Sequence, residues 1–269
     1  MSGTRYEEYE QLRDGLPFVL NADLIRTRFH LSREHNWHEN LEIQFCTEGS
    51  GSVFMDGHQY SFQTQDIAVI NSNVIHYTGT EQNLIYDCLI IGTDFCRQIG
   101  LDPQHVAFAP MIQDPEMTAI FKSLKQVYFT PTLTFRSVLL HKLVLDLLLT
   151  LAQKHNLQKS NSNESSKSYE RVKKALIFIR NHYPEKITLE DIARAAFCDK
   201  YTLCKDFKKH TGQTPFENLN NYRCIRAIEQ LTTGHPVAET AVLCGFENLS
   251  FFTRTFKHYT GKLPSEYKK

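Results

Sequence analysis

Two stretches of the sequence repeat each other: ITLEDIARAAFCDKYTLCKDFKKHTGQTPF at 187–216 and PVAETAVLCGFENLSFFTRTFKHYTGKLPS at 236–265. The repeat brings Phe207 into register with Phe256 and aligns a Thr-Gly pair and a proline in both copies. Coincidences of this number and kind are hard to obtain by chance. The repeated unit therefore predicts a tandem supersecondary motif.

Each copy has the pattern of two short helices joined by a tight turn. In the first copy, Thr188 precedes an acidic first turn and Asp199 can cap the second helix, and Asn248 takes the capping role in the second copy. Small residues at matching places, Ala196 and Gly245, allow the two helices to cross closely. This pattern predicts a helix-turn-helix, whose second helix enters the major groove of DNA.

The second helix of each copy has an apolar face and a polar face. Leu203 and Phe207 mark the inward face of the first, and Phe252 and Phe256 mark that of the second. Lys, Arg and small polar side chains on the outward face are the groups that contact guanine edges and phosphates. The predicted DNA-binding residues are Lys200, Tyr201, Thr202, Lys205, Lys208, Asn248, Ser250, Phe251, Arg254 and Lys257.

A connecting helix is predicted from Pro215 to Leu231, with a length of roughly 24 Å at 1.5 Å per residue. Such a spacer can hold two recognition helices for successive major grooves, which lie about 34 Å apart. Arg223 and Arg226 on this helix fit phosphate contacts and salt bridges equally well.

The region Ile187–Lys269 resembles the DNA-binding domain of AraC-type (AraC/XylS) transcription regulators. The motifs that carry the resemblance are ITLEDIARAAF, the pattern Y-x-L-x-x-x-F-K-K-x-T-G-x-T-P-F, and GFENLSFFTRTFKHYTGKLPSEY. The resemblance implies base-reading roles for Tyr201, Lys205, Ser250 and Arg254. Cys204 and Lys205 depart from the residues that are usual in the family, so the sequence preference of the first half-site is left open.

Charge and composition divide the chain into two parts. Residues 1–168 carry 13 Lys and Arg against 19 Asp and Glu, whereas residues 169–269 carry 17 against 11. The polar run HNLQKSNSNESSKS separates them and predicts a flexible linker. We therefore expect an effector-binding and dimerisation domain over 1–155, a linker over 156–168 and a DNA-binding domain over 169–269.

The N-terminal part changes from strand to helix periodicity. Residues 24–91 contain short β-branched and aromatic runs, with an Asp-Gly hairpin signal at 56–57, and predict a sandwich or small barrel. Two helices are expected at 115–129 and 134–154. The second is apolar on two faces, which favours a dimer partner over deep burial. The expected fold is α+β with two domains: a β-barrel with flanking helices, which the histidine spacing described next makes cupin-like by resemblance, then an all-α domain of two helix-turn-helix units.

Histidine and carboxylate residues gather in the strand region. The spacing His38-x3-Glu42-x6-Gly49, followed by His76, resembles cupin barrels, whose His and Glu ligands hold Fe, Mn or Zn. Asn36 occupies the first ligand position, which favours a polar ligand pocket that has lost the ion over a metal site or structural histidines. We expect neither metal nor cofactor. The candidate ligand-binding residues are Arg28, His35, His38, Glu42 and His76.

The resemblance implies a cytoplasmic homodimer that pairs through the helix at 134–154. Its sensor would bind a small molecule, often a sugar, and change DNA binding or RNA polymerase recruitment, with residues 1–20 as a possible arm over the pocket. We expect an activator and no enzyme. The alternatives are a DNA-binding protein whose N-terminal domain only dimerises and a cupin enzyme with a DNA-binding tail.

No apolar run reaches the 18–20 or so residues of a membrane span. The seven cysteines lack a C-x-x-C and suit free thiols.

Overall fold

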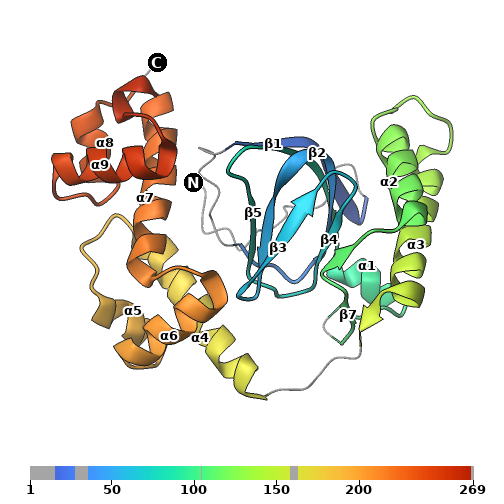
Figure 1. The fold of residues 1–269 in the computed structure, drawn as a ribbon, viewed down its shortest axis with the longest axis horizontal. Helices are drawn as coiled ribbons and strands as arrows, with labels where there is room; N and C mark the ends of the chain where they lie inside the picture. The colour runs from blue at the N-terminus through green and yellow to red at the C-terminus, as the bar shows by residue number, and fades with distance from the viewer. Residues whose placement is uncertain (1–15, 28–35, 104, 158–162, 268–269) are drawn as a thin grey trace.

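The computed structural model describes residues 16–27, 36–103, 105–157 and 163–267 (Figure 1). A sheet-rich N-terminal domain lies between a pair of helices on one side and a helical C-terminal domain on the other. This arrangement confirms the expected two-domain α+β organisation. Arg28, His35 and most of the expected arm at 1–20 lie outside the described residues. Across the described ranges, no helix combines the length and apolar character that a membrane crossing requires.

The N-terminal domain is built around one long strand that takes part in two sheet layers. Its first half pairs with β6 and β4, and its second half pairs with β3 and β5, all antiparallel. The first layer has the strand order β1-β6-β2-β4-β8. These strands are β1 (Phe18–Thr27), β2 (Leu41–Met55), β3 (His58–Gln63), β4 (Ile67–Ile70), β5 (His76–Gly79), β6 (Asn83–Ile91) and β8 (Met111–Ile112).

Glycines let β2 pass from one layer to the other. Gly49 has a φ of +83°, and a Cβ there would lie 2.2 Å from the carbonyl oxygen of Asn83. At Gly51, a Cβ would lie 2.4 Å from the carbonyl oxygen of Gly79. Only a residue without a Cβ fits such close approaches of the backbone. The layers enclose an interior, but hydrogen bonds between the described strands do not close them into a barrel, which corrects the expected closed form.

Alternation along β2 separates two environments. Leu41, Ile43 and Phe45 belong to the apolar core that packs against the helices, whereas Cys46 belongs to the core between the two sheet layers. Because side chains alternate along a strand, Glu42 and Gln44 share the face of Cys46 and point between the layers. The strand therefore places two polar side chains, Glu42 and Gln44, in the interior of the domain.

Two helices cover the outer face of the first layer (Figure 1). These are α2 (Pro115–Tyr128) and α3 (Arg136–Lys154), close to the predicted bounds, with α1 (Thr93–Gln98) beside them. Asp114 caps α2 by accepting hydrogen bonds from the backbone N–H groups of Glu116 and Met117. Strand β9 (Asn156–Leu157) follows α3 and pairs with β7 (Ala107–Phe108), which precedes α2 in the chain.

The C-terminal domain contains the two predicted helix-turn-helix units. Capping residues match the sequence analysis: Thr188 forms a capping box, and Asp199 and Asn248 accept hydrogen bonds from the first turns of their helices. The elements are α4 (Asn163–His182), α5 (Leu189–Ala195), α6 (Lys200–Thr211), α7 (Pro215–Thr232), α8 (Val237–Leu243), α9 (Leu249–Thr260) and the 3₁₀ turn η2 (Pro264–Glu266).

The predicted linker at 156–168 is shorter than expected. Asn156–Leu157 pairs with β7, and α4 begins at Asn163, within the polar run. The cause lies further along α4, where Val172, Leu176 and Ile179 are fully buried in the core of the C-terminal domain. Packing of these residues stabilises the whole helix, so α4 includes a polar N-terminal segment that would not form a helix by itself.

Candidate DNA-binding surface and effector site

In the first helix-turn-helix unit, α6 presents a polar face away from its core. Leu203 and Phe207 are fully buried, whereas Tyr201 is 80% exposed and Lys205 and Lys208 are exposed. The remaining two predicted DNA-binding residues of this unit are engaged at the helix start. Lys200 pairs with Glu190 on α5, and the hydroxyl of Thr202 donates to the carboxylate of Asp199 at 2.6 Å.

The second unit repeats this arrangement. Phe252 and Phe256 are fully buried, and Ser250, Arg254 and Lys257 are exposed along the opposite face of α9. Phe251 is 44% exposed, with its ring centroid 6.1 Å from that of Phe246. Asn248 accepts a hydrogen bond from the backbone N–H of Phe251 at 2.9 Å, so its side-chain oxygen serves as the helix cap.

The two arginines of the connecting helix α7 both have partners within the C-terminal domain. Arg223 is buried; its Nε donates to the carbonyl of Tyr183 at 2.7 Å, and its Nη2 donates to that of Glu185 at 2.8 Å. Arg226 forms an ion pair with Glu229 at 2.9 Å. Arg223 therefore fixes the connection between α4 and α5 through backbone carbonyls, which is a structural role other than the phosphate contact and the salt bridge that were considered for it.

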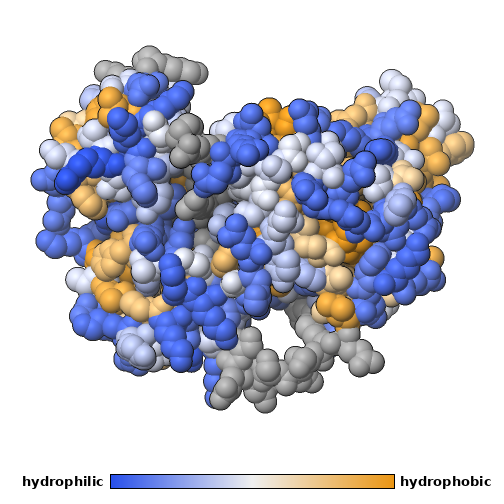
Figure 2. Space-filling view, in the orientation of Figure 1, coloured by the Kyte–Doolittle hydropathy of each residue, from blue (hydrophilic) through white to orange (hydrophobic). Residues whose placement is uncertain are grey.

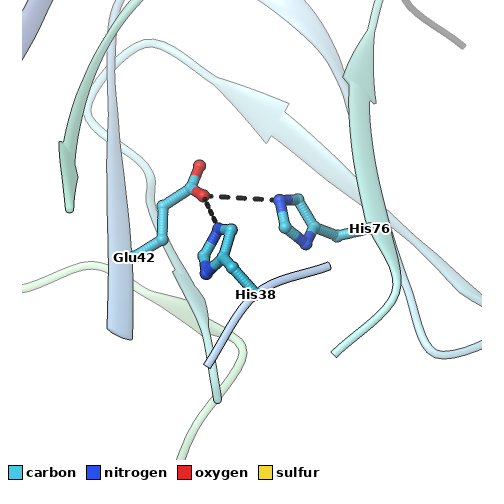
Figure 3. Close-up of side chains that lie close together, drawn as sticks. All are labelled: His38, Glu42 and His76. Carbon is cyan, nitrogen blue, oxygen red and sulfur yellow. Dashed lines mark hydrogen bonds and ion pairs between the residues drawn. The ribbon is translucent and has the colours of Figure 1, made fainter. Parts of the chain in front are cut away.

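A buried histidine–carboxylate cluster lies inside the N-terminal domain (Figure 3). Its members are His38, which precedes β2, Glu42 on β2, and His76 at the start of β5. Oε2 of Glu42 lies 2.8 Å from Nε2 of His38 and 3.3 Å from Nε2 of His76. All three residues are at most 5% exposed.

Neighbouring groups hold the cluster in place. The Oε1 atom of Glu42 accepts a hydrogen bond from Nε2 of Gln44 at 2.6 Å and one from the thiol of Cys88 at 3.1 Å. The hydroxyl of Thr78 donates to Oε1 of Gln44 at 2.6 Å. Burial raises the pKa of Glu42, but attraction to His76 and hydrogen bonds with both histidines outweigh it and hold that pKa well below its ordinary value. Glu42 is therefore a buried carboxylate anion.

The structure brings together three of the five predicted ligand-binding residues, and the other two, Arg28 and His35, lie outside the described residues. Sequence reasoning missed Gln44, Thr78 and Cys88. The alternation that carries Glu42 inward also predicts Gln44, but the contact with Cys88 depends on the register between β2 and β6. Trp37, which precedes His38, packs in the core of the C-terminal domain.

The cluster lies beside the interface between the two domains. Trp37 and Ile75, each adjacent in sequence to a histidine of the cluster, are buried against Val172, Leu176 and Ile179 of α4. The guanidinium of Arg180 lies 5.2 Å from the ring centroid of Trp37, and its Nη2 donates to Oδ1 of Asn36 at 3.2 Å.

A second contact joins the tip of the β2–β3 hairpin to the end of α6. Nδ1 of His210 lies 2.8 Å from Oδ1 of Asp56. At the neighbouring Gly57, with a φ of +84°, a Cβ would lie 2.1 Å from the carbonyl oxygen of Lys209. The hairpin predicted from the Asp-Gly pair is confirmed, and its glycine also allows the close approach of α6.

Comparison with known families agrees with this architecture. Residues 21–148 match the AraC-like ligand binding domain, and residues 192–269 match a helix-turn-helix domain. The chain belongs to the AraC/XylS family. It is a sequence-specific DNA-binding transcription regulator with a ligand-binding domain, and not an enzyme.

Relatives of this AraC-type chain span most of its length. YdeC of Bacillus subtilis (strain 168), an HTH-type transcriptional regulator, is 25% identical over 253 residues, which cover 87% of this chain and 85% of YdeC. RhaS of Salmonella dublin, an HTH-type transcriptional activator, is 23% identical over 239 residues, which cover 83% of this chain and 82% of RhaS.

Solved structures share the two-domain fold. A structure of ToxT from Vibrio cholerae is 15% identical, covers 93% of this chain and 97% of ToxT, and has a TM-score of 0.50. An apo ToxT variant is 14% identical, with 93% and 96% coverage and a TM-score of 0.51. At this level of identity, the likeness concerns the fold alone.

Proposed function

We propose that this AraC-type regulator is a transcription activator whose N-terminal domain binds a small polar effector such as a sugar and whose helices α6 and α9 read DNA. The observation that carries the proposal is the equivalence of the two helices. Each buries two apolar side chains and exposes a basic residue at the same position, Lys205 in one and Arg254 in the other.

The exposed residues divide into two roles. Tyr201, Lys205, Ser250 and Arg254 lie in the first half of their helices and are proposed to read base edges, together with Phe251, whose ring suits a thymine methyl group. The remaining side chains are proposed to contact the phosphate backbone, which sets affinity and its salt dependence. They are Lys200, Thr202, Lys208, Asn248 and Lys257.

The effector site is proposed at the histidine–carboxylate cluster, with Arg28 and His35 as further contacts. Support comes from its chemistry: a buried anion and two imidazoles, backed by Gln44 and Thr78, can exchange hydrogen bonds with hydroxyl groups of a polyol. The residues next to both histidines pack on α4. A ligand that moves either histidine would therefore disturb the contact with the DNA-binding domain.

The proposed dimer forms through α3. One face of this helix is buried in the domain core, while Val138, Leu145 and Leu149 on the other are 66%, 40% and 56% exposed. These residues recur at helical spacing and form a stripe, and apolar surface gathers along the edge of the molecule over α2 and α3 (Figure 2). A second copy of the chain is the proposed occupant, because a contact that pairs identical stripes is self-complementary.

Activation is proposed because the relative RhaS is named a transcriptional activator. An activator bound beside a promoter acts by contacting RNA polymerase, and we place this activity in the cytoplasm, where bacterial DNA is transcribed. RNA polymerase is therefore a proposed partner.

A panel of sugars tests whether the chain binds a sugar and whether that sugar changes its affinity for DNA. Thermal unfolding of the full chain is followed with each sugar, and every stabilising sugar is then added to binding assays with the intergenic DNA upstream of the protein's own gene. Binding at 100 times Kd stabilises a protein by about 2.7 kcal/mol. One sugar that stabilises the chain and shifts DNA affinity supports the proposal. If the chain binds specific DNA with the same affinity in the presence of every sugar, an N-terminal domain that only dimerises is favoured. If the chain does not bind the DNA specifically under any condition, the proposed regulator function is contradicted.

A further inference from the structure

We propose that His38, Glu42 and His76 hold one divalent first-row transition-metal ion, in the class of Zn²⁺ and Fe²⁺. This proposal replaces the expectation of a metal-free pocket that the sequence favoured. It concerns the same cluster as the proposed effector site and deepens that function, but metal binding is measured without DNA or sugar. The failure of either proposal is thus distinguishable from the failure of the other.

The far nitrogen of each ring faces a backbone carbonyl oxygen. Nδ1 of His38 lies 3.1 Å from the carbonyl oxygen of Asn40, and Nδ1 of His76 lies 2.9 Å from that of Val74. A carbonyl oxygen only accepts hydrogen bonds, so Nδ1 carries the proton in both rings. In the neutral tautomer, each Nε2 then has a lone pair, and both Nε2 atoms face the same carboxylate oxygen of Glu42. Ring orientation by a backbone carbonyl is the arrangement typical of metal-bound histidine.

The burial of the carboxylate also favours an ion. Glu42 is buried in an interior lined by apolar residues such as Val53, Phe62 and Ile90, where a charge needs a compensating charge close by. One divalent ion supplies that charge and is a common partner for the carboxylate and both Nε2 atoms.

The distances of both ring nitrogens from the carboxylate oxygen fit such an ion. The three donor atoms all lie within 4.8 Å of one another, with the two nitrogens at 2.8 and 3.3 Å from the carboxylate oxygen. An ion that binds nitrogen and oxygen at about 2.05 Å holds its ligand atoms roughly 2.9 Å apart in octahedral geometry and roughly 3.3 Å apart in tetrahedral geometry. The donor set is two imidazoles and one carboxylate, which suits Zn²⁺ or Fe²⁺ rather than Ca²⁺ or Mg²⁺.

The surroundings complete the site. Gln44 and Cys88 hold the other carboxylate oxygen of Glu42, so the ligand oxygen is fixed in orientation. Three protein ligands leave at least one coordination position for water or another oxygen ligand. A hydroxyl or carboxylate of the effector is suited to that position, which links the ion to the proposed sensing function.

Cobalt titration of the metal-stripped full chain tests the proposal. We expect one Co²⁺ per chain, with visible d–d bands and without a thiolate charge-transfer band, because the ligands are nitrogen and oxygen and not cysteine. His38→Gln and His76→Gln should each abolish the bands, and Gln44→Ala should weaken binding about 10–100-fold as loss of an outer hydrogen bond does. His58→Gln, at an exposed histidine of β3, is the matched control and should bind as the wild type does.

The wild type provides a readout that does not depend on the folding of the variants. If the site exists, its melting temperature rises with Zn²⁺ concentration and falls again with a chelator. The proposal is overturned if the stripped wild type takes up neither Co²⁺ nor Zn²⁺ at micromolar concentration. It is equally overturned if folded His38→Gln and His76→Gln proteins, checked by circular dichroism, bind cobalt as the wild type does.

Discussion

His210, in the last turn of α6, places Nδ1 2.8 Å from Oδ1 of Asp56 at the tip of the β2–β3 hairpin. The other ring nitrogen of His210 lies 2.8 Å from the hydroxyl of Ser168, and the residue is 1% exposed. The C-terminal end of α6 is therefore attached to the N-terminal domain, while its first half carries the exposed residues Tyr201 and Lys205, which are proposed to read bases.

Asp56→Ala tests this attachment. The substitution leaves a buried ring nitrogen of His210 without its partner, so we expect a loss of about 1–3 kcal/mol in the free energy of unfolding. Urea unfolding of the full chain measures it. The control is Asp94→Ala, whose side chain is 92% exposed and pairs with Arg97 on the same helix. Equal stability of the two variants would contradict an energetic role for the contact.

Lys205→Ala and Arg254→Ala test the reading of bases. Each should cost about 1–3 kcal/mol in binding to the specific DNA and relax the preference at one position, because a base contact is lost. Lys208→Ala should weaken binding to all sequences alike and flatten the salt dependence, because a phosphate contact is lost. Fluorescence anisotropy with specific and scrambled duplexes measures both effects. An unchanged ratio of the two affinities in Lys205→Ala and Arg254→Ala would show that these residues do not read bases.

Arg223→Ala distinguishes a structural arginine from a DNA contact. Its two hydrogen bonds hold the carbonyls of Tyr183 and Glu185, so we expect a loss of about 2–3 kcal/mol in stability. Below the unfolding transition, the salt dependence of DNA binding should remain that of the wild type. Thermal unfolding and salt-titrated binding are the two measurements. Wild-type stability together with a flatter salt slope would restore the phosphate role.

Leu145→Asp and Leu149→Asp test the proposed dimer. A charge in the exposed apolar stripe of α3 opposes its burial between two copies, so sedimentation should show a shift to monomer without loss of helix content. Ser123→Asp adds the same charge at an exposed position of α2 and serves as the matched control. A wild type that sediments as a monomer at all concentrations would refute the interface.

The cap of α2 makes a pH-dependent contribution to stability. Burial raises the pKa of Asp114, but hydrogen bonds from His155 and from the N–H groups of Met117 and Glu116 lower it to about 2. The ordinary value is near 4, so the folded state binds fewer protons than the unfolded state; the contribution is complete above about pH 4–5 and is lost as pH falls toward 2.

Asp114→Asn keeps the cap and removes the titration. Its free energy of unfolding should therefore vary less between pH 5 and 2 than that of the wild type, as measured by urea midpoints at each pH. Asp94→Asn, at an exposed carboxylate, controls for the loss of one charge. Identical pH profiles for the wild type and Asp114→Asn would contradict the lowered pKa.

The parts of the fold that were predictable from sequence are set by local signals. The helix-turn-helix units follow from caps such as Asp199 and Asn248, and the hairpin follows from its Asp-Gly turn, because these residues determine the backbone within a few positions. Helix α4 was not defined, because its start in a polar run depends on packing by Val172 and Leu176 further along.

The candidate sites show the same division. The cluster histidines were found because their spacing follows a motif, and the outward residues of α6 and α9 because helical periodicity places them. The surroundings of Trp37 and Arg223 were not predicted, since each depends on a partner distant in sequence, Arg180 for one and Tyr183 for the other. Periodicity shows that a side chain is buried or polar, but not which distant residue it contacts.

Methylation protection of the DNA upstream of the protein's own gene tests most directly whether α6 and α9 read successive major grooves. If they do, each bound chain protects two groups of major-groove positions about one helical turn, or roughly 10 base pairs, apart on one face of the duplex. Arg254→Ala should remove one group and Lys205→Ala the other. A protected region with a single group, or protection unchanged by both substitutions, would show that the two helices do not read successive grooves.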